Sequence, residues 1–366
     1  MSAPRSRVWL RSLAILWLGL LAGFATGIEW VQARPEAPPP PSGGIDLIGA
    51  GATFPYPLYR RWFAEYRAES GVRINYFSVG SGEGIRILLD EGADFGATDR
   101  PLRPEERVRT RCGPVEFPTA VGAIVVVFNL PWMSGRLRLD ADVLAGIFLG
   151  DIRTWDAPPL RALNPGAALP PLPIHVVRRP RTSGTNEVFG EYLSGAAAWR
   201  RATERGGTDR PVGEQIEGNE GVAAEVRSIP GAIGFVEQAY ALESHLDVAA
   251  LRNVAGRYVL PDSTGLAITE RELLSPETSD TVHGLIGARD PGAYPVVAMT
   301  RIVVDAALGD ARRAAHLIAF VRWALRDGAR SAAALGYAPL PSSVTRHLNA
   351  RLDSVRPGTC PTPRTS

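Results

Sequence analysis

The chain has 366 residues, of which 45% are hydrophobic and 21% are charged. This length predicts two domains, each large enough to bury a core of its own. The formal net charge of +2 is too small to indicate a nucleic acid or a membrane surface as a partner. Any binding of an anion must therefore come from local placement of charges and hydrogen-bond donors.

The N-terminus has the pattern of a targeting segment. Three arginines among the first eleven residues precede an uncharged stretch, residues 12–28, that is rich in Leu and Ala. Residues 31–33 then offer a cleavage site of the small-x-small type. We predict that residues 1–33 are a signal peptide for export. The stretch is also long enough for a membrane anchor, so a membrane-tethered form stays open.

Residues 34–44, the cysteines and the histidines allow predictions of a linker, a disulfide and the absence of a metal site. Residues 34–44 contain five prolines and end in Gly-Gly, which predicts an extended linker with a flexible joint. Cys112 and Cys360 are the two cysteines, and in an exported protein such a pair indicates one disulfide, with two separate thiols as the alternative. The five histidines show no metal-ligand spacing, so we expect neither a metal site nor a cofactor.

The globular part opens with a strand, residues 46–48, and a glycine-rich turn, residues 49–55. Apolar residues at 59, 62, 63 and 66 then follow a helical period, and Gly71 ends the helix. The turn lacks the third glycine of a dinucleotide fingerprint, and Pro55 stands where the helix begins. We therefore reject a nucleotide site.

The same design repeats along the first part of the chain. Residues 72–79 predict a second strand, residues 80–84 a small-residue turn and residues 85–89 a short helix. Residues 93–101 then predict a third turn. Repeated strand, turn and helix indicate a doubly wound α/β domain, in which ligands bind at the carboxyl ends of the strands.

Later segments are less regular. Residues 196–217 read as polar loops, and residues 247–290 show no clear periodicity. The remaining apolar segments predict strands at 120–128, 172–177, 231–236 and 295–304, and helices at 143–148, 186–193, 218–227 and 311–327.

The turn between residues 178 and 185 combines arginines with the sequence Thr-Ser-Gly-Thr. It joins a buried strand to a helix, so backbone N–H groups and hydroxyls can converge at the positive end of the helix. With an arginine beside them, these donors suit a tetrahedral oxyanion. The alternative is a surface turn in which Ser183 or Thr185 caps the helix and the arginines are solvated.

Four stretches of the sequence carry a common signal: Gly49–Pro55, Asp94–Asp99, Arg178–Arg179 with Ser183–Thr185, and Pro230–Glu237. Together they resemble the exported phosphate-binding proteins of bacterial high-affinity phosphate ABC transporters. The similarity runs from about residue 47 to about residue 348 and rests on the combination of these stretches, because any one of them alone would be a weak signal.

The resemblance implies a two-lobed α/β periplasmic binding protein of type II. Each lobe would be a doubly wound sheet with flanking helices, and the ligand would lie in the cleft between them. Residues 45–128 and 298–366 would form a discontinuous first lobe, and residues 129–297 the second. The family's phosphate ligands map onto Thr53, Phe54, Ser81, Asp99, Arg179, Ser183, Gly184 and Thr185.

These residues would have distinct roles. Arg179 would form the one strong charge pair, Phe54 would donate its backbone N–H, and Asp99 would accept the proton of bound phosphate. Phosphate near neutral pH keeps at least one proton and sulfate has none, so a buried carboxylate discriminates between them. The family usually has an acidic residue two positions after the binding arginine, whereas this chain has Arg181.

The function implied is a binding protein, not an enzyme, that delivers inorganic phosphate to an ABC permease with its cytoplasmic ATPase. We expect a periplasmic monomer. Another oxyanion, such as sulfate, arsenate or molybdate, is one alternative. A phosphate-ester hydrolase with Ser183 or Ser81 as nucleophile is another, although no histidine lies near either motif in the sequence. A third is an adhesin or signalling domain tethered by an uncleaved N-terminal helix.

Overall fold

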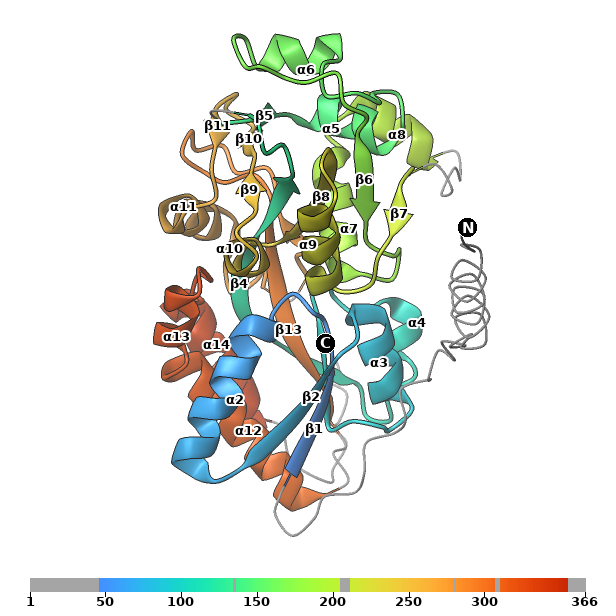
Figure 1. The fold of residues 1–366 in the computed structure, drawn as a ribbon. Coiled ribbons are helices and arrows are strands. Elements are labelled where there is room, and N and C mark those ends of the chain that lie inside the picture. The colour runs from blue at the N-terminus through green and yellow to red at the C-terminus, as the bar shows by residue number, and fades with distance from the viewer. Residues whose placement is uncertain (1–45, 134–135, 205–210, 280, 307–309, 355–366) are drawn as a thin grey trace, which may run out of the picture. The chain divides into compact units, whose positions relative to one another are not determined.

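The computed structural model describes residues 46–133, 136–204, 211–279, 281–306 and 310–354 (Figure 1). The predicted signal peptide or anchor, the linker and Cys360 lie outside the described residues. Cys112 is not a free thiol. Within the described ranges, no helix is both long enough and apolar enough to cross a membrane.

A mixed sheet runs through the described residues in the strand order β2-β1-β3-β13-β4-β8-β6-β7, and β12 and β9 pair with β13 and β4. Its strands are β1 (Asp46–Gly51), β2 (Arg73–Ser78), β3 (Phe95–Thr98), β4 (Pro114–Phe128), β6 (His175–Arg178), β7 (Glu214–Gln215), β8 (Ala232–Glu237), β9 (Asp247–Val248), β12 (Gly284–Leu285) and β13 (Val297–Asp305). A small second sheet contains β5 (Arg138–Leu139), β10 (Ala250–Arg252) and β11 (Tyr258–Val259).

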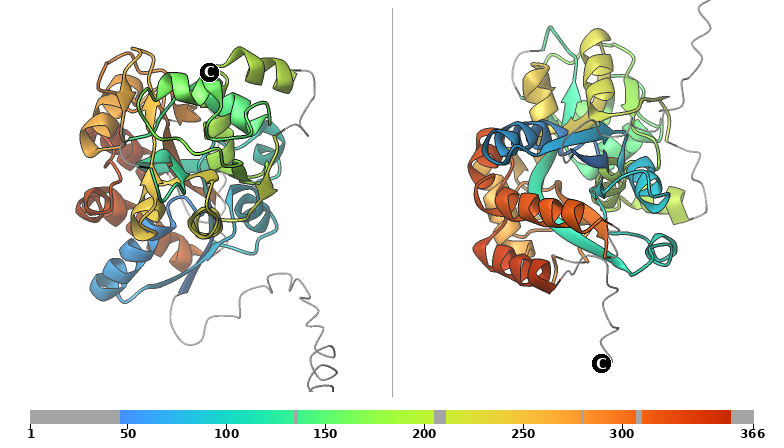
Figure 2. Two further views of the ribbon diagram at one scale, coloured as in Figure 1. Left: turned by 45° about the horizontal axis from the view of Figure 1, so that its top comes forward. Right: turned by 90° about the horizontal axis from the view of Figure 1, so that it is seen from below.

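Helices flank these sheets (Figures 1 and 2). Those of the first part of the chain are α2 (Tyr56–Ser70), α3 (Ser81–Leu89), α4 (Pro104–Arg107), α5 (Ala141–Phe148), α6 (Pro158–Leu163) and α7 (Gly184–Leu193). The later ones are α8 (Ala197–Glu204), α9 (Asn219–Ser228), α10 (Gln238–Glu243), α11 (Ser263–Leu273), α12 (Ala311–Arg326), α13 (Ala329–Ala334) and α14 (Ser342–Ser354).

The long strand β4 joins two lobes. Residues 114–123 of β4 pair with β13, whereas Ile124–Phe128 pair with β8. We call the part built on β1, β2 and β3 with α2, α3 and α12 the first lobe, and the part built on β6, β7 and β8 with α7 and α9 the second lobe (Figure 1). The predicted α/β, two-lobed architecture is confirmed; the exact residue limits of the lobes stay a prediction.

Parallel pairing in the first lobe gathers three turns at one edge. Strand β1 lies between β2 and β3 and runs parallel to both, with Gly51 opposite Ser78 and Ala97. The chain leaves all three strands at this edge, so the turns that carry Thr53, Ser81 and Asp99 lie together. The candidate site on this side thus follows from strand register.

Aromatic packing anchors the outer face of the first lobe. Helix α12 lies beside α2, far from it in sequence (Figure 2), with a Phe63–Phe320 ring separation of 5.5 Å. Tyr66 and Trp323 repeat the contact at 5.5 Å. Since such rings contribute large buried apolar areas, helix α12 closes the core of the first lobe.

Two parts of the sequence were interpreted wrongly. Residues 93–101 were predicted as a turn, but Phe95–Thr98 form strand β3, fully buried between β1 and β13. Small residues suit it because Leu88 and Ile85 of α3 pack directly on Gly96. Residues 196–217, which predict polar loops, contain helix α8. The segment 247–290, for which the sequence predicts no element, contains α11, where Thr269 and Glu270 are buried with Leu266 and weaken the apolar stripe.

Substitution at Gly84 tests the packing of α3 on β1. A Cβ there would lie 2.1 Å from Gly51 Cα, in backbone that cannot move aside. We expect Gly84→Ala to lower the free energy of unfolding by about 1–3 kcal/mol, measured by urea titration. Gly190→Ala is the matched control, since a Cβ on Gly190 of α7 meets nothing within 4 Å. That variant should gain roughly 0.5–1 kcal/mol, and equal effects at both positions would contradict this packing.

Candidate functional site

The eight residues expected to form the site lie where the two lobes meet. Each is buried. The first lobe contributes Thr53 and Phe54 after β1, Ser81 at the start of α3 and Asp99 after β3. The second lobe contributes Arg179 after β6 and Ser183, Gly184 and Thr185 at the start of α7. The structure thus brings all of them into one region.

Asp99 is a carboxylate at the boundary between the lobes. Its Oδ2 accepts hydrogen bonds from Ser81 Oγ at 3.5 Å, in its own lobe, and from Thr185 Oγ1 at 3.4 Å, in the other. Its Oδ1 is buried without a hydrogen-bond partner. Burial raises the pKa of Asp99 to about 7, although attraction to Arg179 and the nearby hydroxyls of Thr300 and Thr185 oppose the shift. Protonation or deprotonation of this carboxyl therefore changes the free energy of the site near neutral pH.

Arg179 faces the same region from the second lobe. Its side chain is 2% exposed, and Nη1 donates a long hydrogen bond of 3.4 Å to Thr53 Oγ1. Its Nε is buried without a partner. Burial lowers the pKa of Arg179, and the nearby charges of Asp99, Glu220 and Glu217 act against that shift. The guanidinium is desolvated and only partly satisfied by the protein, which is costly unless another acceptor reaches it.

The start of α7 supplies further donors. Ser183 is the N-cap, and its Oγ accepts from the Asn186 amide at 3.3 Å. The amides of Gly184 and Thr185 have no intrahelical acceptor, because they belong to the first turn. Across the boundary, the amide of Phe54 has no hydrogen-bond partner among the described residues. These amides can serve a negatively charged guest.

Gly184 is required for the close approach of the lobes. A Cβ on this residue would lie 2.7 Å from Ser81 Oγ and 2.9 Å from Asp99 Cβ, both in the first lobe. Nearby, the Gly82 amide donates to the Thr182 carbonyl at 3.1 Å across the same boundary. The structure therefore shows the lobes in contact at the site, that is, closed.

Sequence reasoning missed two residues that hold Thr53. Asn219 Nδ2 donates to Thr53 Oγ1 at 2.7 Å, and the Tyr240 hydroxyl donates to the Thr53 carbonyl at 2.6 Å. Both belong to elements that pack with the second lobe, α9 and α10. A signal for Asn219 was present, because it follows Gly218 at the start of a helix, in the manner of the other site turns. Tyr240 gave no local signal.

The arrangement can bind an anion, but in the part of the chain that the structure describes it lacks the base that a serine nucleophile needs. Ser81 and Ser183 hydrogen-bond to Asp99 and to an α7 amide, and no histidine among the described residues contacts either hydroxyl. Asp99 is the neighbour of Ser81, but it is shared with Thr185 and lies opposite Arg179. What converges here are donors and one carboxyl, the set that suits a partly protonated oxyanion.

One group of residues away from this site has metal-ligand chemistry. Ligand atoms of His175, Glu214 and Glu225 lie within 4.8 Å of one another. They come from β6, β7 and α9, so no sequence spacing reveals them. The side chains of His175 and Glu214 are 38% and 50% exposed, whereas His175 Nε2 itself is buried and lies 3.5 Å from Glu214 Oε2. The cluster supports no assignment of a metal.

Comparison with known proteins gives the family. A model of the PBP superfamily domain matches residues 36–327. The phosphate-binding protein PstS of Xylella fastidiosa (strain Temecula1) is 37% identical over 318 residues, covering 85% of this chain and 87% of that protein. The PstS of Haemophilus influenzae is 35% identical and covers 83% and 92%. The chain belongs to the PstS family.

Solved structures agree on the fold of this PstS family member. A phosphate-binding protein from Stenotrophomonas maltophilia superposes with a TM-score of 0.63 at 17% identity, over 84% of this chain and 94% of that one. A phosphate ABC transporter substrate-binding protein from Clostridium perfringens, solved with bound phosphate, gives 0.58 at 18% identity, over 81% and 100%. At these identities the likeness concerns the fold alone.

The raised pKa of Asp99 predicts how stability depends on pH. Because the folded protein holds this proton up to about pH 7, whereas an unfolded Asp releases it near pH 4, the wild type loses stability as pH rises through that window. Asn cannot titrate. We therefore expect the unfolding free energy of ligand-stripped Asp99→Asn, relative to wild type, to increase between pH 4 and 8 by on the order of 4 kcal/mol.

Urea titrations of both proteins at pH 4, 6 and 8 measure this difference. The altered hydrogen bonding of Asn adds an offset that is the same at each pH, so only the slope counts. A difference that stays constant with pH would mean that Asp99 ionises as an ordinary carboxyl.

Proposed function

We propose that this chain binds inorganic phosphate between its two lobes and delivers it to an ABC permease for import. The observation that supports this best is the presence of two buried charged side chains from opposite lobes, Asp99 and Arg179, each with a polar atom that the protein leaves unsatisfied. Membership of the PstS family supports the same ligand.

In this proposal each residue has the role that its geometry allows. Arg179 pairs with the anion, and Thr53, Ser81, Ser183 and Thr185 offer hydroxyls. The amides of Phe54, Gly184 and Thr185 donate to the remaining oxygens. Asp99 accepts a proton carried by the ligand. Since contacts come from both lobes only when these are together, the ligand favours the closed state.

Selectivity follows from Asp99. Sulfate and molybdate carry no proton near neutral pH, so either would bring oxygen lone pairs against a buried carboxylate with an unsatisfied Oδ1. Phosphate can donate a proton there, and arsenate shares this property. The proton therefore separates the phosphate class from sulfate, and does not separate phosphate from arsenate.

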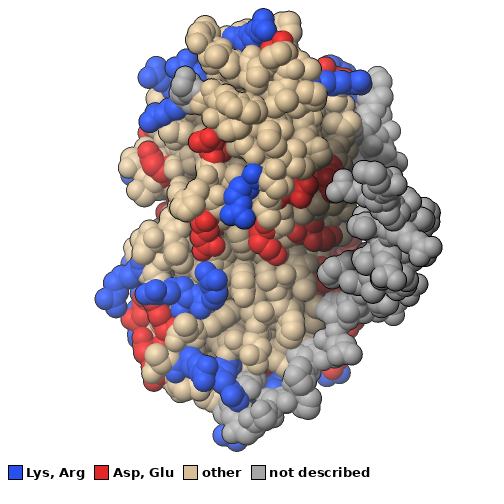
Figure 3. Space-filling view, in the orientation of Figure 1, with Lys and Arg blue, Asp and Glu red and all other residues tan. Residues whose placement is uncertain are grey.

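Attraction must be local. On the face drawn in Figure 3, acidic side chains lie across the middle, where the lobes meet. This face presents no broad positive patch there, and the formal net charge is only +2. Affinity in this proposal comes from desolvated donors within the site and not from long-range steering.

The remaining parts of the function are inferred from the family. We propose a periplasmic monomer, or a membrane-tethered form if the N-terminal segment is not cleaved, with permease subunits and a cytoplasmic ATPase as partners. The lobes would be residues 45–128 with 298–366 and residues 129–297, and Cys112 would pair with Cys360. A hydrolase using Ser183 finds no support, because that hydroxyl caps α7.

Calorimetric titration of the mature, ligand-stripped protein with phosphate, arsenate and sulfate tests the ligand. We expect micromolar or tighter binding of phosphate and no heat with sulfate. Asp99→Asn should weaken phosphate and narrow the gap between phosphate and sulfate, because the amide no longer requires a proton on the ligand. Absence of phosphate binding by the wild type would overturn the proposed function, and an unchanged ratio in the variant would remove Asp99 as the proton acceptor.

The role of Arg181 is tested by ionic strength. Arg181 is exposed, and no carboxylate of the described residues hydrogen-bonds Arg179 in the way the family's usual acid would. An exposed cation near the site attracts phosphate through solvent, where salt screens it within about 8–10 Å. We expect phosphate affinity of the wild type to fall more steeply between 20 and 500 mM NaCl than that of Arg181→Asp.

A control separates position from net charge. Arg271→Asp makes the same charge change on the exposed face of α11, and its salt dependence should match the wild type. Identical curves for wild type and Arg181→Asp would show that Arg181 has no part in binding.

A further inference from the structure

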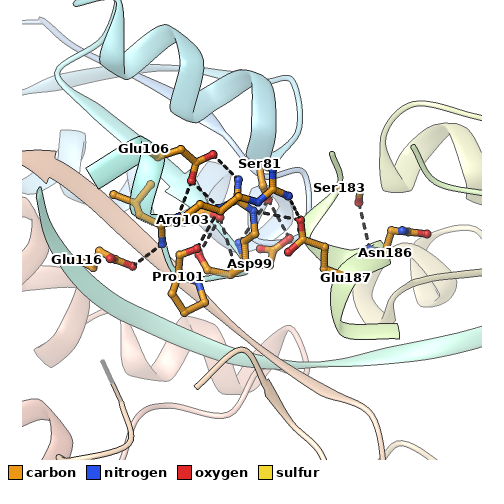
Figure 4. A network of polar contacts seen from close by, with 12 residues as sticks. Ser81, Asp99, Pro101, Arg103, Glu106, Glu116, Ser183, Asn186 and Glu187 are labelled. Carbon is orange, nitrogen blue, oxygen red and sulfur yellow. Dashed lines mark hydrogen bonds and ion pairs between the residues drawn. The ribbon is translucent and has the colours of Figure 1, made fainter. Parts of the chain in front are cut away.

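Glu187 is a carboxylate of the second lobe that meets two arginines of the first. It lies in the first turn of α7, two residues after the site residue Thr185. Its Oε1 is 3.3 Å from Arg100 Nε, and it also accepts a hydrogen bond from Arg103 Nη2. Figure 4 shows Glu187 facing the cluster that contains Asp99 and Arg103, with Ser183 and Asn186 on its other side. These ion pairs cross the boundary between the lobes.

Contacts within the first lobe alone hold the Arg100 side chain in place. Its Nη1 and Nη2 donate to the two oxygens of Glu106 at 2.7 and 2.6 Å, and Nη1 also donates to the Pro101 carbonyl at 2.9 Å. The side chain is 1% exposed, and its Nε has no hydrogen-bond partner, so its 3.3 Å contact with Glu187 is an ion pair without a hydrogen bond. The guanidinium is thus a buried charge, held in place within the first lobe, that the carboxylate of the opposite lobe meets.

The other contacts between the lobes are of different kinds. Asn219 and Tyr240 hold Thr53, a residue of the site itself. The Arg60–Glu243 pair spans 3.4 Å with both side chains more than half exposed, and such pairs contribute little. Glu187 has a side-chain exposure of 24% and contacts a buried arginine, so its ion pairs are less screened.

We propose that Glu187, with Arg100 and Arg103, forms an electrostatic clasp that holds the lobes closed and sets the rate at which the ligand leaves. The clasp rests on the proposed function, because closure matters only if the ligand binds between the lobes. Glu187 is a positioning residue: it acts through the lobe contact and touches no ligand. Its negative charge would otherwise oppose an anion at the start of α7, and the two arginines neutralise it.

Glu187→Gln tests the clasp and leaves the first lobe intact, because Arg100 keeps both bonds to Glu106. The readout is dissociation of radiolabelled phosphate, chased with excess unlabelled phosphate, at 20 and 500 mM NaCl. We expect the dissociation rate at low salt to rise about tenfold and the association rate to change less than threefold, since interface changes act mainly on dissociation. Salt should accelerate release from the wild type and have a smaller effect on the variant.

Glu83→Gln is the matched control. Glu83 lies in the first turn of α3, close to Ser81, and pairs with Arg86 inside its own lobe. It should release phosphate at the wild-type rate. Arg103→Gln removes the half-exposed partner and should raise the dissociation rate in the same direction as Glu187→Gln, with the double variant showing less than the product of the two effects.

The outcomes separate the two proposals. A wild type that binds no phosphate refutes the proposed function. A wild type that binds phosphate, together with a Glu187→Gln rate within twofold of it, refutes the clasp alone. Slower release or tighter binding by Glu187→Gln would also overturn the clasp, because it would show that repulsion of the anion outweighs lobe closure. If Glu83→Gln accelerated phosphate release as much as Glu187→Gln, the clasp would also be refuted. The effect would then come from removing any negative charge near the start of a helix.

Discussion

The constraint on which this molecule depends is the burial of Asp99 and Arg179 at one boundary. Neither charge has the full set of partners that burial normally demands, since Asp99 Oδ1 and Arg179 Nε lack hydrogen bonds. A carboxylate and a guanidinium in this condition are costly to the folded state. Their cost is reduced by mutual attraction and by Thr53, Ser81 and Thr185, and a proton-bearing oxyanion would satisfy both. Under the proposed function, the same unsatisfied groups that destabilise the free protein would therefore contribute to its affinity for the ligand.

Topology explains how charges from opposite lobes come to face each other. Parallel β1, β2 and β3 place Thr53, Ser81 and Asp99 at one edge through register, and parallel β6 and β7 do the same for Arg179 and the start of α9. Strand β4 pairs with both halves, so the two edges share one continuous sheet. Close approach then needs residues without side-chain bulk at the boundary, which is why Gly184 lies against Ser81 and Asp99.

The local parts of this arrangement were accessible from the sequence. The alternation of strand and glycine-rich turn predicted the α/β class, and the Thr-Ser-Gly-Thr turn beside Arg179 indicated an anion. Resemblance to a family supplied Asp99 and the other half of the site. Strand β3 was missed because four small or buried residues carry no alternation when both faces of a strand are covered. Asn219, Tyr240 and the ion pairs of Glu187 depend on contacts between distant segments, which no local pattern encodes.

At Arg181 the surroundings of the candidate site differ from the family pattern, whereas the candidate ligand residues match it. In the family an acid on the same loop usually orients the binding arginine, and here that position is an exposed cation. The charges that act most strongly on Arg179 are Asp99 from the other lobe and, after it, Glu220 and Glu217 near the start of α9. The strongest favourable charge on Arg179 thus comes from the first lobe, so the stabilisation of its guanidinium depends on closure. In our proposal closure is in turn supported by Glu187, which lies one turn of helix beyond the cap residue Ser183. Without an acid on its own loop, Arg179 therefore depends on charges from segments distant in the sequence, and the ion pairs of Glu187 act on the same closure.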